Sequence, residues 1–328
     1  MKLFKFLLFL SSLSLFAHAF TLSEAWSDFK STHSKSYSPS EEPPRFQIFL
    51  SNLQIIDQIQ QADPNAVYGI TKFSDLTPEE FQTLYLSPID ESKEQFPPSK
   101  TYQRSSLLSD SVPDSWNWTA EGAVTPVKDQ GICGGAYWAF SAIAAIESQY
   151  YLIYNVSYNF SEQQLIDCDT ADKGCYGGGS ITGAYSYLQQ AGGLESSKNY
   201  PYFGYSMPCA YNSSFASTKV TGYMSISQDE SEIAEALYEK GPLSTYINAY
   251  WLQFYKKGVM TPLKCDKEKL NHAVTLVGYG VEQDKKDVEY WIAKNSWGSG
   301  WGEDGYFRIK RGDGVCGINL NVSLPIIG

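Results

Sequence analysis

PVKDQGICGGAYWAFS occupies residues 126–141 and leads into a helical pattern that continues to Tyr151. Residues 138–151 contain no glycine or proline and are mostly good helix formers, so a helix is expected to begin beside Trp138. The N-terminus of a helix presents free N–H groups and the positive end of its dipole, which lower the pKa of a thiol placed there. Ala136 and Tyr137 directly precede Trp138 and are therefore expected at this helix start.

Three further segments follow this one in the chain. They are SEQQLIDC at 161–168 with GCYGG at 174–178, NHAV at 271–274 with GYG at 278–280, and KNSWGSGWG at 294–302. One such segment is a weak signal, whereas four in this order over most of residues 112–328 are a specific one. Together they resemble the papain family of cysteine proteases.

Helical patterns come first after residue 112 and strand patterns come later. The helical patterns cover 138–151, 161–166 and 232–240, and the strand patterns cover 243–247, 273–279, 290–294 and 306–310. This order is typical of an α+β protein with two subdomains. The resemblance implies a papain-like fold, in which a helical subdomain and a β-barrel-like subdomain enclose a cleft, preceded by a helical inhibitory propeptide.

The N-terminal part of the chain contains no cysteine and has a helical pattern over residues 41–60. It resembles the inhibitory propeptide of cathepsin L-like proteases in Glu41, Arg45, Phe49, Asn52 and Ile56. Gln60 and Thr71 depart from the family motifs, which have Asn at both positions. Residues 91–111 are polar and are expected to form an exposed linker. We therefore expect a signal peptide at 1–19, a propeptide at 20–111 and a peptidase domain at 112–328.

The start of the chain has the features of a secretory signal peptide: two lysines, a short apolar run, and Ala17-His18-Ala19 as the cleavage site. The run is too short for a membrane anchor, so no membrane association is expected after cleavage. Passage through the secretory pathway, to the extracellular space or to a lysosome or vacuole, is supported by sequons at Asn117, Asn155, Asn159, Asn212 and Asn321. The net charge of −11 argues against a nucleic-acid partner. We expect a monomer without metal or cofactor.

A thiol protease needs a thiolate, a histidine that shuttles the proton, a group that orients this histidine, and donors for the oxyanion. By resemblance, His272 is the base and Asn295 orients it. Gln130 is implied as the oxyanion donor, and Trp297 as a shield over the His–Asn hydrogen bond. His272 is the only histidine after residue 33. The alternative is a histidine with a purely structural role in the core.

The nucleophile of the family is missing from this chain. The family has it six residues after the glutamine and directly before Trp-Ala-Phe. Counting forward from Gln130 reaches Ala136, and counting back from Trp138 reaches Tyr137, because one residue is inserted. The methyl group of Ala136 cannot act as a nucleophile. The phenol of Tyr137 has an unperturbed pKa of ~10 and is therefore protonated at the pH of most compartments. Because removal of a triad nucleophile costs on the order of 10⁶-fold in kcat, we predict that the protein as written is inactive.

The chain has six cysteines, and an even count in a secreted protein predicts three disulfides. Spacing alone leaves about 15 connectivities open. The resemblance implies the pairs Cys133–Cys175, Cys168–Cys209 and Cys265–Cys316. All six cysteines are then used. The alternative, in which Cys133 is the nucleophile, leaves Cys175 without a partner.

The resemblance also implies a cleft that binds peptides. Gly177 and Gly178 match the glycine pair whose backbone pairs with an extended peptide. The second specificity pocket is expected near Gly179, Ser180, Tyr246, Leu270, Ala273 and Asn321. Tyr246 stands where most members of the family have a small or aliphatic residue, and an outward-pointing Tyr246 is the alternative. The sequon at Asn321 is expected to stay unglycosylated because it maps to the pocket floor.

Three hypotheses for the function follow from these observations. The first is a catalytically inactive member of the papain family that binds a peptide or protein in its cleft and is also bound by its own propeptide. The second is an active cysteine endopeptidase of an acidic compartment, with an erroneous or unusual nucleophile segment. The third is a secreted storage or structural protein on the same scaffold.

Overall fold

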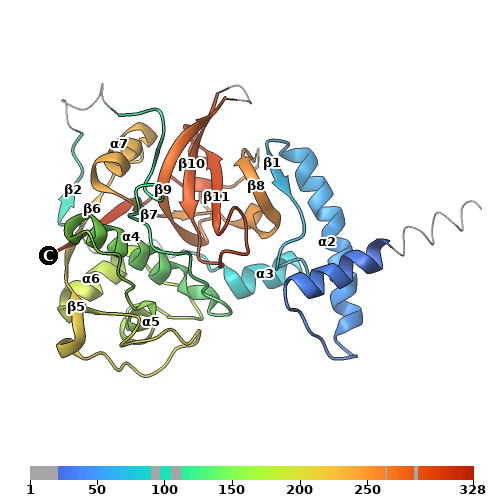
Figure 1. Cartoon of the computed structure of the whole chain (residues 1–328), viewed down its shortest axis with the longest axis horizontal. Coiled ribbons are helices and arrows are strands. Elements are labelled where there is room, and N and C mark those ends of the chain that lie inside the picture. The colour runs from blue at the N-terminus through green and yellow to red at the C-terminus, as the bar shows by residue number, and fades with distance from the viewer. Residues whose placement is uncertain (1–20, 90–96, 105–111, 263, 284–286) are drawn as a thin grey trace, which may run out of the picture.

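The computed structural model describes residues 21–89, 97–104, 112–262, 264–283 and 287–328 (Figure 1). A helical part and a part built on a large sheet lie next to each other. Residues 21–89, called the N-terminal segment below, pack mainly against the sheet part. The expected signal peptide at 1–19 lies outside the described residues. No helix in the described part of the chain is long and apolar enough to cross a membrane.

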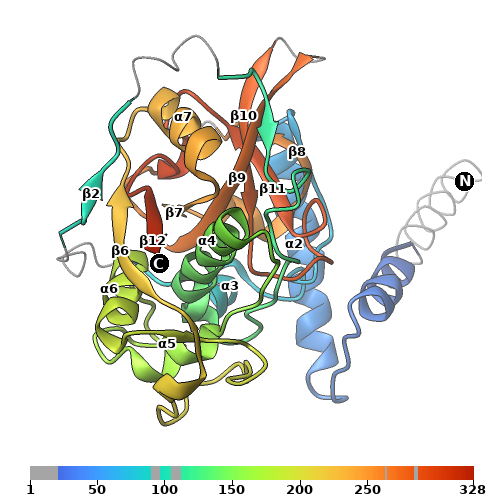
Figure 2. The same cartoon turned by 60° about the vertical axis from the view of Figure 1, so that its left-hand side comes forward.

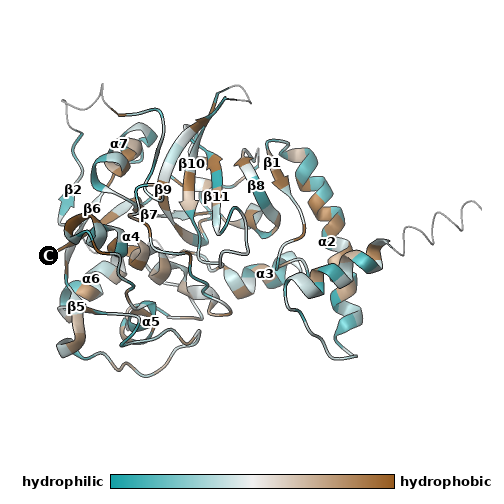
Figure 3. Cartoon of the chain, in the orientation of Figure 1, coloured by the Kyte–Doolittle hydropathy of each residue, from teal (hydrophilic) through white to brown (hydrophobic). Residues whose placement is uncertain are grey.

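The N-terminal segment is built from helices and one short strand. Residues 21–32 are helical and are followed by α2 (Glu42–Ala62), β1 (Ala66–Tyr68) and α3 (Pro78–Tyr85). Hydrophobic and hydrophilic residues alternate along α2 (Figure 3), and its buried Phe49 packs with Trp26 and Phe29 in a small core of its own. The expected helix over 41–60 is therefore present.

The helical part is organised around one buried helix. Its elements are η2 (Gly134–Ala136), α4 (Tyr137–Tyr154), α5 (Glu162–Cys168), α6 (Ile181–Ala191), β4 (Leu194–Glu195), η3 (Ser213–Phe215) and β5 (Ala216–Thr218). Residues 137–148 of α4 are all buried, because α4 packs against α5 and α6 on one side and against the sheet on the other (Figure 2). An apolar surface on all sides is typical of such an enclosed helix.

The sheet part contains a single ten-stranded sheet in the order β1-β8-β11-β10-β9-β7-β12-β6-β2, with β3 paired to β9. The strands outside the N-terminal segment are β2 (Lys100–Thr101), β3 (Trp116–Asn117), β6 (Val220–Ser225), β7 (Leu243–Ile247), β8 (Tyr255–Met260), β9 (His272–Glu282), β10 (Val288–Lys294), β11 (Tyr306–Lys310) and β12 (Ser323–Ile327). The helices of this part are α7 (Glu230–Lys240), η4 (Tyr250–Phe254) and η6 (Val315–Gly317). The expected papain-like α+β architecture is confirmed.

The described residues of the linker expected at 91–111 are residues 97–104, and all of them except Tyr102 are exposed. Within its described residues, β2 pairs in parallel with β6, Tyr102 is buried and donates a hydrogen bond to Glu239, and Arg104 pairs with Glu235. Over residues 97–104 the expected exposed linker is therefore present, and it is anchored to the sheet part by the buried Tyr102 and by β2. Residues 90–96 and 105–111 lie outside the described part.

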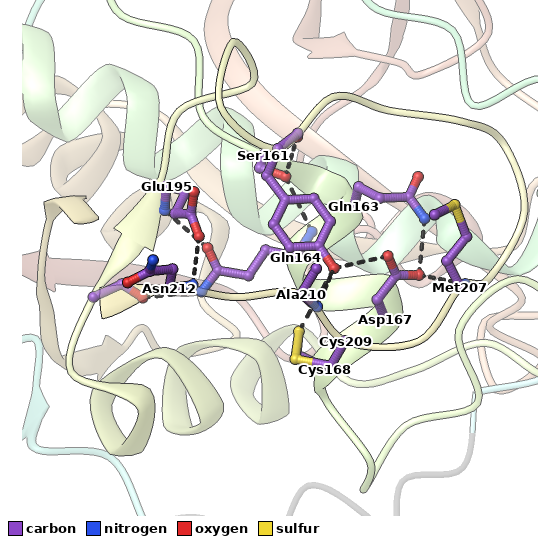
Figure 4. Close-up of a disulfide and its surroundings, with 12 residues drawn as sticks. Ser161, Gln163, Gln164, Asp167, Cys168, Glu195, Met207, Cys209, Ala210 and Asn212 are labelled. Carbon is purple, nitrogen blue, oxygen red and sulfur yellow. Dashed lines mark hydrogen bonds between the residues drawn. A yellow bond between two sulfur atoms is a disulfide. The ribbon is translucent and has the colours of Figure 1, made fainter. Parts of the chain in front are cut away.

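Three disulfides join Cys133 to Cys175, Cys168 to Cys209 and Cys265 to Cys316. They are the pairs that the resemblance implies. Figure 4 shows the second of them, next to Asp167, whose carboxylate accepts hydrogen bonds from the Gln163 side chain and from the backbone N–H of Met207. The first disulfide ties the loop that precedes α4 to the loop that carries Gly177 and Gly178.

Candidate active site

The start of α4 and the ends of two strands meet at one point of the structure. Tyr137 is the first residue of α4, whereas Ala136 belongs to the 3-10 turn before it. His272 begins β9, and Asn295 directly follows the last residue of β10. Because β9 and β10 are antiparallel neighbours, the start of one lies beside the end of the other, which brings His272 and Asn295 together.

His272 is fully buried and held by Asn295. Its Nε2 donates to Asn295 Oδ1 at 2.8 Å, so the lone pair of the neutral ring lies on Nδ1. Within the described residues Nδ1 has no hydrogen-bond partner. Burial, only partly offset by the bond to Asn295, lowers the pKa of His272 from 6.5 to about 4. The imidazole is therefore neutral at the pH of most compartments.

Trp297 lies over His272, with ring centroids 4.8 Å apart. On its other sides it meets Phe73 and Phe81 of the N-terminal segment, at 5.2 and 5.4 Å. Trp297 is fully buried. The aromatic cover over the His272–Asn295 bond is therefore continued by side chains of the N-terminal segment.

Tyr137 occupies the space next to His272. Its ring centroid is 5.4 Å from that of His272, and its hydroxyl donates to the carbonyl oxygen of Ser87 at 3.0 Å. The side chain is fully buried. Burial, and then the charge of Asp172, raise the pKa of the Tyr137 phenol far above its usual value. It is therefore a neutral hydrogen-bond donor and not a phenolate.

Gln130 lies near the same helix start, but its amide is already engaged. Its Nε2 donates to the carbonyl oxygen of Gly134 at 2.9 Å, and its Oε1 accepts from the hydroxyl of Ser296. Gln130 is fully buried. The expected oxyanion donor therefore has a protein partner in this structure. The inserted residue belongs to the turn that supplies the Gly134 carbonyl. The spacing of the motif did not predict the hydrogen bond between the Gln130 amide and this carbonyl.

Cys133 forms a disulfide with Cys175, and no cysteine of the described chain is free. The alternative in which Cys133 is the nucleophile is wrong for this structure, because a disulfide sulfur is not a thiolate. No group of three or more histidine, cysteine or acidic side chains suitable for a metal ion occurs among the described residues.

The cleft beside Tyr137 contains the end of the N-terminal segment. The N–H of Ser87 donates to the carbonyl of Asn271, and the N–H of Ile89 donates to the carbonyl of Leu270, each at 3.0 Å. The opposite wall comes from the loop after the first disulfide. A small hollow between the two is lined by Pro88, Ile89, Lys173, Gly177, Gly178, Gly179 and Ser180. Sequence reasoning did not identify Ser87 or Pro88 as parts of the site.

Tyr246 fills the place that was expected to be a specificity pocket. It lies on β7 opposite Ala273 of β9 and is fully buried together with Leu270 and Ala273. Its hydroxyl accepts a hydrogen bond from the N–H of Ile181, the first residue of α6, at 2.7 Å. The alternative of an outward-pointing Tyr246 was therefore wrong. A free N–H at the helix start provides the polar partner that this buried hydroxyl needs.

The fold and this cleft are those of a papain-like cysteine protease with its propeptide in place. The sequence matches the papain family cysteine protease model over residues 112–326 and the cathepsin propeptide inhibitor domain (I29) over residues 26–81. The chain therefore belongs to the papain family of cysteine proteases.

Several known proteins are similar to the chain over most of its length. It is 40% identical to cathepsin F of Mus musculus over 306 residues, which are 92% of this chain and 64% of that protein. It is 41% identical to cysteine proteinase 15A of Pisum sativum over 320 residues, which are 93% of this chain and 87% of that protein. The structure of digestive procathepsin L2 from the larval midgut of Tenebrio molitor matches with a TM-score of 0.81 and 34% identity, over 93% of this chain and 99% of that one.

Proposed function

We propose that this chain is a papain-family protein that holds an extended peptide in its cleft and does not hydrolyse it. The observation that supports the proposal is Tyr137, a buried phenol at the first position of α4 with its ring 5.4 Å from His272. A thiolate would be needed there for covalent catalysis.

The neighbouring groups do not supply the missing step. The buried Nδ1 of His272 has a lone pair without a hydrogen-bond partner among the described residues, but the phenol beside it has a raised pKa and resists deprotonation. The Nε2 of Gln130 already faces two backbone carbonyls, those of Gly134 at 2.9 Å and Cys133 at 3.5 Å. Loss of the nucleophile alone is expected to lower kcat by a factor on the order of 10⁶.

The test is to restore the family's segment. Replacing Gly135-Ala136-Tyr137 by Ser-Cys deletes the inserted residue and places a thiol at the start of α4. We expect this variant, after removal of its propeptide by an added protease, to react with epoxide probes of thiol proteases and to hydrolyse peptides at acidic pH. The matched control is the same variant with His272→Ala, which should not hydrolyse peptides. A repaired variant that folds but reacts with no probe would mean that the rest of the site has also lost its function.

One observation favours a second candidate, an active cysteine endopeptidase whose true sequence differs at this segment. The His272–Asn295 hydrogen bond has kept a length of 2.8 Å. Sequencing of the transcript across codons 130 to 141 decides between the two candidates, because a cysteine codon directly before Trp138 would establish the second.

We further propose that residues 1–19 are a signal peptide, that 20–111 are removed as a propeptide by another protease, and that 112–328 remain. The three disulfides support an oxidising compartment, either extracellular or lysosomal or vacuolar. A protein without a nucleophile cannot remove its own propeptide, so the proposal requires a second protease.

A further inference from the structure

Residues 87–89 lie in the cleft outside any helix or strand and are held there by hydrogen bonds to the main chain of residues 270–271 and to Tyr137. Two bonds within the described residues join main-chain atoms: the Ser87 N–H donates to the carbonyl of Asn271, and the Ile89 N–H donates to the carbonyl of Leu270. A further bond comes from a side chain, because the Ser87 carbonyl accepts from the Tyr137 hydroxyl at 3.0 Å. Pro88 lies between the two donors, at the position whose N–H would face away from the pairing residues, so its missing N–H costs no bond.

The position of the Tyr137 hydroxyl is fixed by the opposite wall of the cleft. A Cβ atom at Gly178 would lie 2.4 Å from this hydroxyl oxygen, and Gly178 has a φ of +71°. Only glycine leaves room for the phenol and adopts this backbone conformation easily. The ring is confined on its other side by His272. The hydroxyl is therefore held at one place, facing the peptide main chain.

The chemistry of the phenol suits a permanent donor. Burial and the nearby Asp172 raise its pKa, so it stays protonated at acidic as well as neutral pH. A protonated phenol donates its hydrogen bond to an acceptor. The main-chain carbonyl oxygen of an extended peptide is such an acceptor. Ser87 supplies this carbonyl from within the chain.

We propose that Tyr137 is a peptide-binding residue, whose hydroxyl holds a main-chain carbonyl of an extended segment paired with residues 270–271. The inference rests on the proposed function and deepens it. The ligand class is an extended peptide that offers N–H groups two residues apart to the carbonyls of Asn271 and Leu270, and the intervening carbonyl to Tyr137. A proline between the two donors is accepted.

The test uses the full chain and measures hydrogen exchange of the amides of Ser87 and Ile89, whose bonds open when the segment leaves the cleft. Tyr137→Phe removes only the hydroxyl. Loss of one neutral hydrogen bond is expected to speed exchange at these two amides about two- to tenfold. The matched control is Tyr202→Phe, which removes the hydrogen bond from the Tyr202 hydroxyl to the Gln130 carbonyl in the same part of the molecule.

Faster exchange confined to residues 82–89 in Tyr137→Phe, and not seen in Tyr202→Phe, supports the inference. Unchanged exchange in Tyr137→Phe overturns it, and so does an equal increase across the whole domain. Neither of these results bears on whether the protein hydrolyses peptides. Hydrolysis by the unmodified protein would instead overturn the proposed function, so the two failures are distinguishable.

Discussion

Tyr137 and His272 lie side by side at the centre of the cleft, and the sequence located both of them. The two counts from Gln130 and Trp138 left Ala136 and Tyr137 as alternatives, and the structure places Tyr137 at the first position of α4. The motifs gave no information on the partner of the Tyr137 hydroxyl. Ser87 is 50 residues away in sequence, and only the docked N-terminal segment brings the two together.

Gln130 illustrates a contact that sequence spacing does not define. Its motif is intact, but the turn that follows contains one residue more than the family pattern. The carbonyl of Gly134 accepts the amide hydrogen in the folded chain. A side-chain amide bonds whichever acceptor the local backbone presents, and the backbone path of an insertion is not encoded in a motif.

At the residue scale, we predict that His272 makes the stability of the protein depend on pH. Its pKa is 6.5 when unfolded and about 4 when folded, so between these values the unfolded chain binds more protons and stability falls as the pH falls. Linkage gives a loss of about 2 kcal/mol between pH 7 and about pH 4.5 from this group alone. Denaturant unfolding of the full chain at the two pH values measures it.

His272→Gln is the control for this prediction. The variant lacks the titrating group and should lose correspondingly less stability between the two pH values, whatever its stability at neutral pH. An unchanged pH dependence in the variant would show that His272 is not buried in its neutral form.

At the element scale, α2 is the clearest success of the sequence pattern. The expected helix over residues 41–60 is α2, Glu42–Ala62, because apolar residues at three- and four-residue steps require a helix to reach one face. The motif residue Asn52 has a physical role. It is 1% exposed, and its Nδ2 donates to the carbonyls of Ser74 and Leu76, each at 2.8 Å.

We predict that Asn52→Ala loosens the N-terminal segment. The change leaves the buried carbonyl of Ser74 without its Asn52 donor, whereas the carbonyl of Leu76 keeps the Gln253 amide as a donor. An unsatisfied buried group costs about 1–3 kcal/mol. The measurement is limited proteolysis of the full chain, in which residues 21–89 should be cut faster. Ser51→Ala, on the exposed face of the same helix, should be cut at the wild-type rate. Equal rates for both variants would mean that Asn52 does not anchor the segment.

At the scale of the whole molecule, the order of helices and strands predicted the two-part architecture, and the motifs predicted the family. The extension of the large sheet at both edges by segments from outside the expected peptidase domain was not predictable. β1 pairs with β8, and β2 with β6, although both strands have only two or three residues. Strands this short show no alternation of apolar and polar residues in the sequence, and they form only where the folded chain lies beside an edge of the sheet.

The N-terminal segment also fills the cleft. It contacts Trp297 through Phe73 and Phe81 and enters the cleft at Ser87. A functional test of the cleft therefore requires that this segment be removed first.

The central claim is that this papain-family cleft binds peptide without cutting it. The most direct measurement cleaves the linker with an added protease, inactivates that protease, and follows hydrolysis of a fluorogenic peptide at acidic and at neutral pH. We predict no hydrolysis above that of the His272→Ala variant prepared in the same way. Hydrolysis by the unmodified protein that disappears in His272→Ala would contradict the account, because it would require a nucleophile other than Tyr137 beside this histidine.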